Sequence, residues 1–196
     1  MLYRLFYIFS FLTISSILLA DKDHTNLLIY GDSISAGYGM DTEKQWSEEL
    51  QKILIKEKIS LTIINKSLSG ETTGGGLSRL ENIIVNSKPS YILIELGGND
   101  ALRGYPPAKI KNNIQEMIDL SIGKGVKVLL MQIRILPNYG KRYQASFESL
   151  YVEVSEENNI PLIPFMLNDI ALNKELMLDD GIHPNATAQP LIAEFL

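Results

Sequence analysis

The stretch Leu27–Met40 reads L-L-I-Y-G-D-S-I-S-A-G-Y-G-M. Its apolar beginning is too short to form a helix by itself and predicts a β-strand over Leu27–Tyr30. The strand is followed at once by Gly-Asp-Ser at positions 31–33 and then by two more glycines. By itself this pattern fits an ordinary turn, a phosphate-binding loop or a serine placed for catalysis, so residues elsewhere in the chain must decide.

Apolar runs and amphipathic segments alternate along the rest of the chain. This alternation predicts an α/β fold with a five-stranded parallel sheet and helices on both of its faces. Pro161 and Pro164 favour an edge position for the last strand. The runs that predict the other strands are Ser60–Ile64, Tyr91–Leu96, Val126–Ile133 and Ile160–Phe165. The segments that predict helices are Glu43–Lys58, Leu77–Ser87, Pro107–Ile122, Tyr143–Asn158 and Ala186–Leu196.

Polar, glycine-rich segments follow several of the predicted strands. In parallel α/β sheets, ligand sites lie beyond the carboxyl ends of the strands, so we expect the residues after Tyr30, Ile64, Leu96 and Ile133 to face a common cleft. The segments concerned are 31–33, 67–72 and 97–100, together with 179–185 after the last strand.

A serine hydroxyl needs a base to become a nucleophile, and the base is usually a histidine held by a carboxylate. The chain has only two histidines, His24 and His183. His24 lies beside a predicted cleavage point near the amino terminus, so His183 is the candidate base for Ser33. Asp180 precedes His183 by three residues in a loop bounded by glycine and proline, and one tight turn would bring its carboxylate to the imidazole.

The oxyanion of a tetrahedral intermediate needs hydrogen-bond donors. The backbone N–H of Ser33 is one candidate, and the N–H of Gly70 is a second because glycine permits close approach of the backbone. Asn99 supplies a side-chain N–H. One such donor typically contributes about 3 kcal/mol to stabilisation of the transition state.

Composition excludes several other chemistries. The 196 residues carry a net charge of −5, which argues against a nucleic-acid partner. The chain has no cysteine, which excludes disulfides and thiolate chemistry, and its two histidines exclude a zinc site built from several histidines. Gly31–Gly39 lacks the Gly-Lys-Ser/Thr ending of a phosphate loop, and no G-x-G-x-x-G pattern follows the first strand. We therefore expect neither a cofactor nor a metal.

The first 20 residues, MLYRLFYIFSFLTISSILLA, differ from the rest of the chain. Arg4 is their only charge, and the apolar stretch after it is shorter than the roughly 20 residues that span a bilayer. This arrangement predicts a secretory signal peptide over 1–20, a single domain over 21–196, and a periplasmic or secreted protein. An uncleaved membrane anchor is the alternative.

The polar segments together resemble the four sequence blocks of the SGNH (GDSL-type) hydrolase family. The blocks are Gly31–Ser35, Gly70, Gly97–Asp100 and Asp180–His183, and the resemblance extends over nearly all of 26–196. It is closest to the bacterial periplasmic branch of thioesterases and lysophospholipases, as the segments 97–104, 136–140 and 179–190 indicate. The resemblance implies a flavodoxin-like three-layer α/β/α fold without cofactor or metal. It also implies Ser33 as nucleophile, His183 as general base, Asp180 as its orienting acid, and an oxyanion hole of Ser33, Gly70 and Asn99.

The implied substrates are acyl thioesters and carboxylic esters, including lysophospholipids and arylesters. In this branch the loop Ala101–Pro106 lies beside the acyl pocket. The residues expected to contact substrate are Ala101, Leu102, Leu136 and Tyr139. We expect a monomer that contacts membranes only through lipid substrates or an uncleaved leader.

Three alternatives remain open. A carbohydrate acetyl esterase would use the same four blocks. A flavodoxin-like module could bind a flavin or nucleotide without catalysis. A catalytically inactive envelope-binding protein would usually have lost a triad or oxyanion residue, and none is missing here.

Overall fold

The structure, a computed structural model, describes residues 25–135 and 137–196. The predicted signal peptide over 1–20, His24 and Leu136 therefore lie outside the described residues. No helix in the described part of the chain is long and apolar enough to cross a membrane.

A single parallel sheet organises the described residues, with strand order β2-β1-β3-β4-β5. The strands are β1 (Thr25–Gly31), β2 (Leu61–Asn65), β3 (Tyr91–Glu95), β4 (Lys127–Met131) and β5 (Leu162–Ile163). The α-helices are α1 (Trp46–Lys56), α2 (Thr73–Ser87), α3 (Gly98–Leu102), α4 (Pro107–Gly123), α5 (Lys141–Asn158) and α6 (Gln189–Phe195). Short 3-10 turns cover Thr42–Lys44, Pro137–Tyr139 and Lys174–Leu176. The predicted five-stranded parallel α/β fold is confirmed, and so is the edge position of the last strand.

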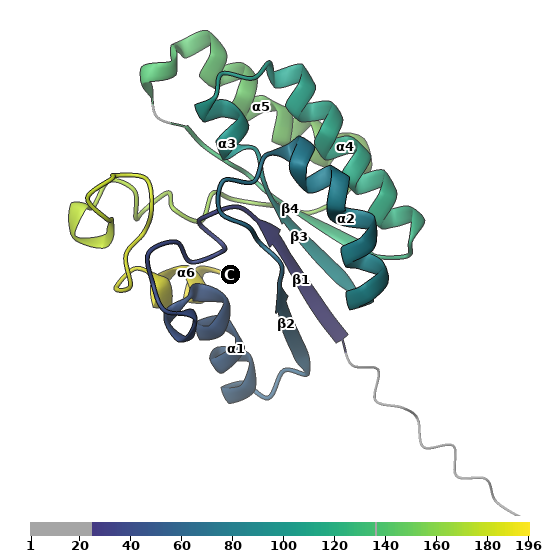
Figure 1. Cartoon of the computed structure of the whole chain (residues 1–196), viewed down its shortest axis with the longest axis vertical. Helices are drawn as coiled ribbons and strands as arrows, with labels where there is room; N and C mark the ends of the chain where they lie inside the picture. Colours follow the sequence, from purple (N-terminus) through teal and green to yellow (C-terminus); the bar gives the residue numbers. More distant parts are fainter. Residues whose placement is uncertain (1–24, 136) are drawn as a thin grey trace, which may run out of the picture.

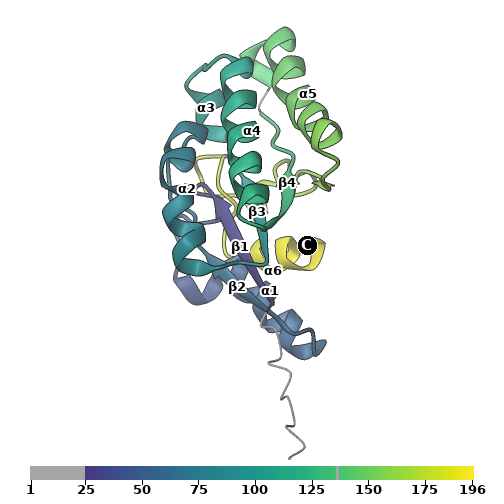
Figure 2. The same cartoon turned by 90° about the vertical axis from the view of Figure 1, so that its right-hand side faces the viewer.

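Helices cover both faces of the sheet. Helices α2, α4 and α5 lie together on one side, and α1 and α6 lie together on the other (Figure 1). The view turned by 90° shows α4 and α5 side by side along the sheet (Figure 2). The result is the three-layer α/β/α arrangement that the sequence predicted.

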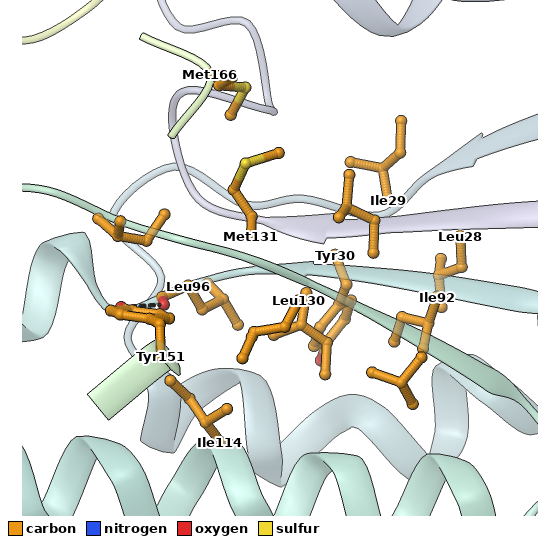
Figure 3. Packing of buried hydrophobic residues seen from close by; sticks show 14 of the residues in the cluster. Leu28, Ile29, Tyr30, Ile92, Leu96, Ile114, Leu130, Met131, Tyr151 and Met166 are labelled. Atoms are coloured by element: carbon orange, nitrogen blue, oxygen red, sulfur yellow. Dashed lines mark hydrogen bonds between the residues drawn. The ribbon is translucent and has the colours of Figure 1, made fainter. Parts of the chain in front are cut away.

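Successive side chains of each strand point to opposite faces of the sheet and form a hydrophobic core on each face. Tyr30 and Leu130 point to the face of the sheet that α2, α4 and α5 cover, where Ile114 and Tyr151 also lie, whereas Ile29 and Met131 point to the opposite face (Figure 3). All of these side chains are buried because parallel strands covered on both faces have no solvent-exposed side. Removing each such side chain from water stabilises the fold by about 1.5–3 kcal/mol.

Helix α2 begins at Thr73, earlier than the predicted start at Leu77. Glycines 74–76 lie in its first turn. The Thr72 hydroxyl caps this turn by accepting the Gly75 N–H at 3.2 Å. A Cβ at Gly76 would lie only 2.6 Å from Leu96 Cδ1, so the helix packs on the sheet here because position 76 has no side chain.

The predicted helix over Glu43–Lys58 is divided at Gln45. A 3-10 turn ends at Lys44, and α1 begins at Trp46. The Trp46 N–H, which has no partner inside its own helix, is satisfied by Gln189 Oε1 at 3.0 Å. This bond joins the start of α1 to the first residue of α6.

The chain leaves β1 toward β2 on one side and later returns to β3 on the other. This reversal makes the carboxyl ends of β1 and β3 a topological switch point, where a crevice opens in folds of this type. The segments that follow β1, β2 and β3 meet there.

Candidate active site

Ser33, His183 and Asp180 are joined by hydrogen bonds at the carboxyl end of the sheet. His183 Nε2 lies 2.8 Å from Ser33 Oγ, and His183 Nδ1 lies 2.7 Å from Asp180 Oδ2. An ionised carboxylate can only accept, so Nδ1 carries the proton and Nε2 accepts from the serine hydroxyl. The structure thus brings together residues that are 150 positions apart in the sequence.

The serine loop begins directly at the end of β1. Ser67 Oγ accepts the Gly31 N–H at 3.0 Å, and Gly31 O accepts the Leu68 N–H at 3.1 Å, so the end of β1 is tied to the loop after β2. A turn follows in which Asp32 O accepts the Ala36 N–H at 2.8 Å. The start of the loop that carries Ser33 is therefore held by the loop after β2 and by its own turn.

The Asp180–His183 turn is built by the carboxylate itself. Asp180 Oδ1 accepts the N–H groups of Ile182 and His183 at 2.9 and 3.0 Å, which leaves Oδ2 for the imidazole. Partial desolvation would raise the pKa of Asp180, but the hydrogen bonds from His183 and Ile182 outweigh it and lower the pKa to about 2. The carboxylate is therefore ionised at neutral pH.

The candidate oxyanion donors Ser33, Gly70 and Asn99 line one cleft. Within the described part of the chain, the N–H groups of Ser33 and Gly70 make no hydrogen bond and are free to bind a ligand. Gly70 adopts φ +79°, a conformation that side chains other than glycine rarely accept. Arg103 donates to the Gly70 carbonyl at 3.2 Å, and this contact fixes the orientation of that loop.

These groups line a cleft of about 270 Å³. Its polar residues include Ser33, Asn99 and His183, and its apolar walls come from the loop after β1, from helix α3 and from the loop that carries His183. The cleft is lined by Asp32, Ser33, Ile34, Tyr38, Ser69, Gly70, Asn99, Leu102, Ile182 and His183. A polar reacting centre beside apolar walls can accommodate an ester carbonyl with an apolar acyl or alcohol group.

The four expected substrate contacts have different outcomes. Leu102 lines the cleft. Ala101 is fully buried and does not line the cleft, because residues 98–102 form a short helix in which Asn99 and Leu102 line the cleft and Ala101 packs in the core; its contact with substrate stays a prediction. Tyr139 lines a separate depression with Lys141 and Tyr143 and not the Ser33 cleft. Leu136 lies outside the described residues.

The buried carboxyl groups of Asp32 and Glu95 accept hydrogen bonds from the serine loop. The Ser35 hydroxyl donates to Glu95 Oε2 at 2.7 Å, and the Asp32 N–H approaches the same oxygen at 3.3 Å. Burial raises the pKa of Asp32 to about 6, and burial together with the nearby Asp32 raises the pKa of Glu95 well above its usual range. Asp32 and Glu95 thus act as structural partners of the serine loop.

Sequence reasoning also missed Tyr38, Ile34 and Ile182 as residues of the cleft. Tyr38 packs its ring against the imidazole of His183, with 4.4 Å between the ring centroids. A large aromatic residue between two glycines in the loop after the serine was the available signal. A glutamate at the end of an otherwise apolar strand was the corresponding signal for Glu95.

Comparison with known proteins identifies the family. The model of the GDSL-like lipase/acylhydrolase family matches residues 29–189, which is most of the chain. The chain belongs to the GDSL-like lipase/acylhydrolase family. As a member of this family, it is a hydrolase that acts on ester bonds.

Relatives within the GDSL-like family are similar over most of their length. The arylesterase of Vibrio mimicus is 46% identical over 90% of this chain and 88% of that protein. The thioesterase 1/protease 1/lysophospholipase L1 of Escherichia coli K12 is 39% identical over 87% of this chain and 80% of that protein. The crystal structure of the psychrotrophic esterase EstA from Pseudoalteromonas sp., inhibited by monoethylphosphonate, superposes with a TM-score of 0.86. It is 42% identical and covers 87% of this chain and 93% of its own.

Proposed function

We propose that this chain hydrolyses acyl esters and thioesters with Ser33 as nucleophile, His183 as general base and Asp180 as the orienting acid. The observation that carries the proposal is the continuous hydrogen-bonded series from Asp180 Oδ2 through His183 to Ser33 Oγ, with distances of 2.7 and 2.8 Å. It lies beside a cleft with unpaired backbone donors. Few structural roles require these features together.

In the first half of the reaction, His183 Nε2 removes the Ser33 hydroxyl proton while Oγ attacks the carbonyl carbon of the substrate. The N–H groups of Ser33 and Gly70 and the Asn99 amide stabilise the oxyanion that forms. The protonated His183 then gives its proton to the leaving alcohol or thiol as the bond to the carbonyl carbon breaks. An acyl-Ser33 ester remains.

In the second half, a water molecule takes the position of the leaving group. His183 Nε2 removes one of its protons while its oxygen attacks the acyl-enzyme carbonyl. Collapse of the second tetrahedral intermediate returns the proton to Ser33 Oγ and releases the carboxylic acid. Throughout, the ionised Asp180 stabilises the imidazolium form of His183. No step of this sequence requires a metal or an organic cofactor.

The apolar walls of the cleft support acyl esters as substrates. Tyr38, Leu102 and Ile182 are each between 40% and 50% exposed at the cleft, so an apolar acyl or aryl group would remove their surfaces from water. The names of the relatives point to the same substrates, since they describe an arylesterase and a thioesterase that is also a lysophospholipase. A carbohydrate acetyl esterase would rely less on apolar walls.

Hydrolysis of a p-nitrophenyl ester by the wild type and Ser33→Ala tests the mechanism. We expect Ser33→Ala to lose nearly all activity and to keep its Tm. A fluorophosphonate probe should label the wild type at Ser33 and should not label the variant. Ser35→Ala is the matched control, because Ser35 is a buried serine of the same loop whose hydroxyl donates to Glu95 and does not contact His183. Near-native activity of Ser33→Ala would exclude Ser33 as nucleophile.

A substrate panel then defines the class of ester. It comprises acyl-CoAs, lysophospholipids, short arylesters and acetylated sugars, compared by kcat/KM. The proposal predicts that acyl-CoAs, lysophospholipids or arylesters are preferred. A clear preference for acetylated sugars would assign the chain to carbohydrate deacetylation.

We further propose that residues 1–20 direct export and are removed, which leaves 21–196 as a single monomeric domain. The proposal rests on the sequence of the leader. The mass of the protein recovered from periplasm or culture medium checks the cleavage, and its elution volume in size-exclusion chromatography checks the oligomeric state. A recovered mass that includes residues 1–20 would favour the uncleaved anchor.

A further inference from the structure

Tyr38 covers one face of the candidate catalytic histidine. The two rings lie 4.4 Å apart between centroids and are inclined by 33°. The imidazole is 15% exposed at its side chain, whereas Tyr38 as a residue is 50% exposed. The tyrosine therefore shields the histidine while its own outer face remains in water.

The loop that carries Tyr38 is tied to the nucleophile. The Tyr38 N–H donates to the carbonyl of Ser33 at 3.1 Å, and Gln45 Nε2 donates to the carbonyl of Ala36 at 3.0 Å. Tyr38 thus has a fixed backbone position relative to Ser33. The ring that packs on His183 is therefore carried by the same loop as the nucleophile.

The loop that carries His183 has little regular structure. The Leu178 N–H donates to the carbonyl of His183 at 2.8 Å, and a single isolated β-bridge pairs Met177 with Pro184. Besides the contact between Tyr38 and His183, this loop approaches the serine loop at Leu178. A Cβ at Gly39 of the serine loop would lie 3.0 Å from Leu178 Cδ1. The two loops therefore pack together at Tyr38 and at Gly39.

Asp180 and Ser33 hold the edge of the imidazole, but a hydrogen bond at each ring nitrogen does not prevent the ring plane from tilting. An aromatic ring packed on one face of the imidazole prevents this tilting. We propose that Tyr38 is a positioning residue for His183, which keeps the imidazole in line between Asp180 and Ser33 and stabilises its protonated form during the reaction. This inference rests on the proposed function, because it assigns His183 the role of general base.

The chemistry of the tyrosine ring suits this role. An aromatic face attracts a cation that lies within about 6 Å of its centroid. The His183 ring is a cation only after it has taken the serine proton, so the attraction strengthens as the transition state forms. No hydrogen bond to the Tyr38 hydroxyl occurs in the described part of the chain, so the ring and not the phenol carries the effect.

A contact between Tyr38 and the acyl group of the substrate is the competing explanation, because Tyr38 also lines the cleft. The two roles differ in their dependence on the substrate. A residue that acts through His183 affects every ester by the same factor. A residue that contacts the acyl chain affects long esters more than short ones and leaves reaction with a small phosphonate unchanged.

The test compares Tyr38→Phe, which keeps the aromatic face, with Tyr38→Leu, which keeps an apolar side chain without it. For each variant, kcat and KM are measured on p-nitrophenyl acetate and p-nitrophenyl decanoate, together with the rate of inactivation by a small fluorophosphonate. The low-field proton resonance of His183 Nδ1–H reports on the hydrogen bond to Asp180. Thermal unfolding checks that each variant is folded.

We expect Tyr38→Phe to remain within about twofold of the wild type. Tyr38→Leu should lose roughly 3- to 30-fold in kcat on both esters and in the inactivation rate, with KM little changed, and its Nδ1 proton should exchange faster with water. Full activity of Tyr38→Leu would overturn the proposal. So would a loss confined to the decanoate with a normal inactivation rate. Retained activity of Ser33→Ala would instead contradict the proposed function, whatever the Tyr38 variants do.

Discussion

Asp32 Oδ2 accepts a hydrogen bond from Asn99 Nδ2 at 3.0 Å. One N–H of the Asn99 amide is therefore committed to Asp32, and the other makes no hydrogen bond to the described residues, at a position that lines the cleft. Asp32 also accepts the Ile34 N–H at 3.1 Å, so its carboxylate is fixed by the serine loop. The second residue of the Gly-Asp-Ser motif thus orients a donor that the chain supplies after the third strand.

Removal of this carboxylate should impair the oxyanion hole. We expect Asp32→Ala to lower kcat by roughly 10- to 100-fold, less than the 10²- to 10³-fold loss typical when an oxyanion donor itself is removed. Asn99→Ala should show that larger loss. The double variant should resemble Asn99→Ala alone, because Asp32 would act through Asn99. Additive losses would mean that Asp32 acts by another route.

The buried carboxyl groups of Asp32 and Glu95 should make stability fall as pH rises. The pKa of Asp32 is raised to about 6 from 3.8, and that of Glu95 is also raised, so the folded state binds protons more tightly than the unfolded state. The two carboxyl groups do not lower the free energy of unfolding at low pH, where they are protonated in both states. They lower it increasingly as pH rises through their pKa values in the folded state.

Glu95→Gln removes one of these carboxyl groups while its amide oxygen can still accept from the Ser35 hydroxyl. We expect Tm to fall less between pH 5 and pH 8 in Glu95→Gln than in the wild type. A difference of 1 kcal/mol corresponds to about 2–4 °C for a chain of this size. Parallel Tm profiles for the two proteins would contradict this account.

Asp180→Asn should remove the charge that stabilises the imidazolium of His183. Loss of the carboxylate in comparable triads lowers kcat by about 10⁴-fold, and we expect a loss of 10³- to 10⁴-fold here. Asp179→Asn is the matched control, since it makes the same change at the neighbouring exposed aspartate. Similar kinetics for the two variants would argue against Asp180 as the triad acid.

The same carboxylate contributes to stability with the opposite pH dependence. Because its pKa is about 2 in the folded state, below the ordinary 3.8, its contribution is present above about pH 4 and is lost as pH falls toward 2. Acid titration of the wild type and Asp180→Asn, followed by circular dichroism, should show this contribution in the wild type alone.

Gly76→Ala should destabilise the protein because its Cβ would lie 2.6 Å from Leu96 Cδ1 and 3.4 Å from Tyr30 Cε1. Overpacking of this kind typically costs about 1–3 kcal/mol. Gly74→Ala is the control in the same helical turn, where the nearest atom to the new Cβ would be 3.7 Å away. We expect Gly74→Ala to be neutral or stabilising, since alanine favours a helix more than glycine does. Equal unfolding free energies for the two variants would disprove the close approach.

Leu102→Ala should change the preference for acyl length, because Leu102 forms an apolar wall of the cleft. The ratio of kcat/KM between decanoate and acetate esters should fall by several-fold as apolar contact is lost. Leu172→Ala removes a leucine that is 92% exposed and does not line the cleft, and it should leave the ratio unchanged. An unchanged ratio in Leu102→Ala would place the acyl group elsewhere.

The sequence by itself determined the class of fold and the composition of the site. Apolar runs of strand length, separated by helical segments, leave a parallel sheet covered on both faces as the way to bury their side chains. The carboxyl ends of parallel strands meet at one edge, so the positions of Ser33, Gly70 and Asn99 in segments that follow predicted strands already implied that they lie together. Asp180 and His183 were expected to share one turn because they are three positions apart in the sequence.

Only the tertiary structure decided how each side chain faces that edge. Residues 98–102 are too few for a helical period to show in the sequence, so the burial of Ala101 and the exposure of Leu102 to the cleft depend on how α3 packs. The contacts of Tyr38 with His183 and of Asp32 with Asn99 join segments that are distant in the chain. Such contacts have no local pattern, because they arise from the packing of one loop on another and not from the preference of either segment.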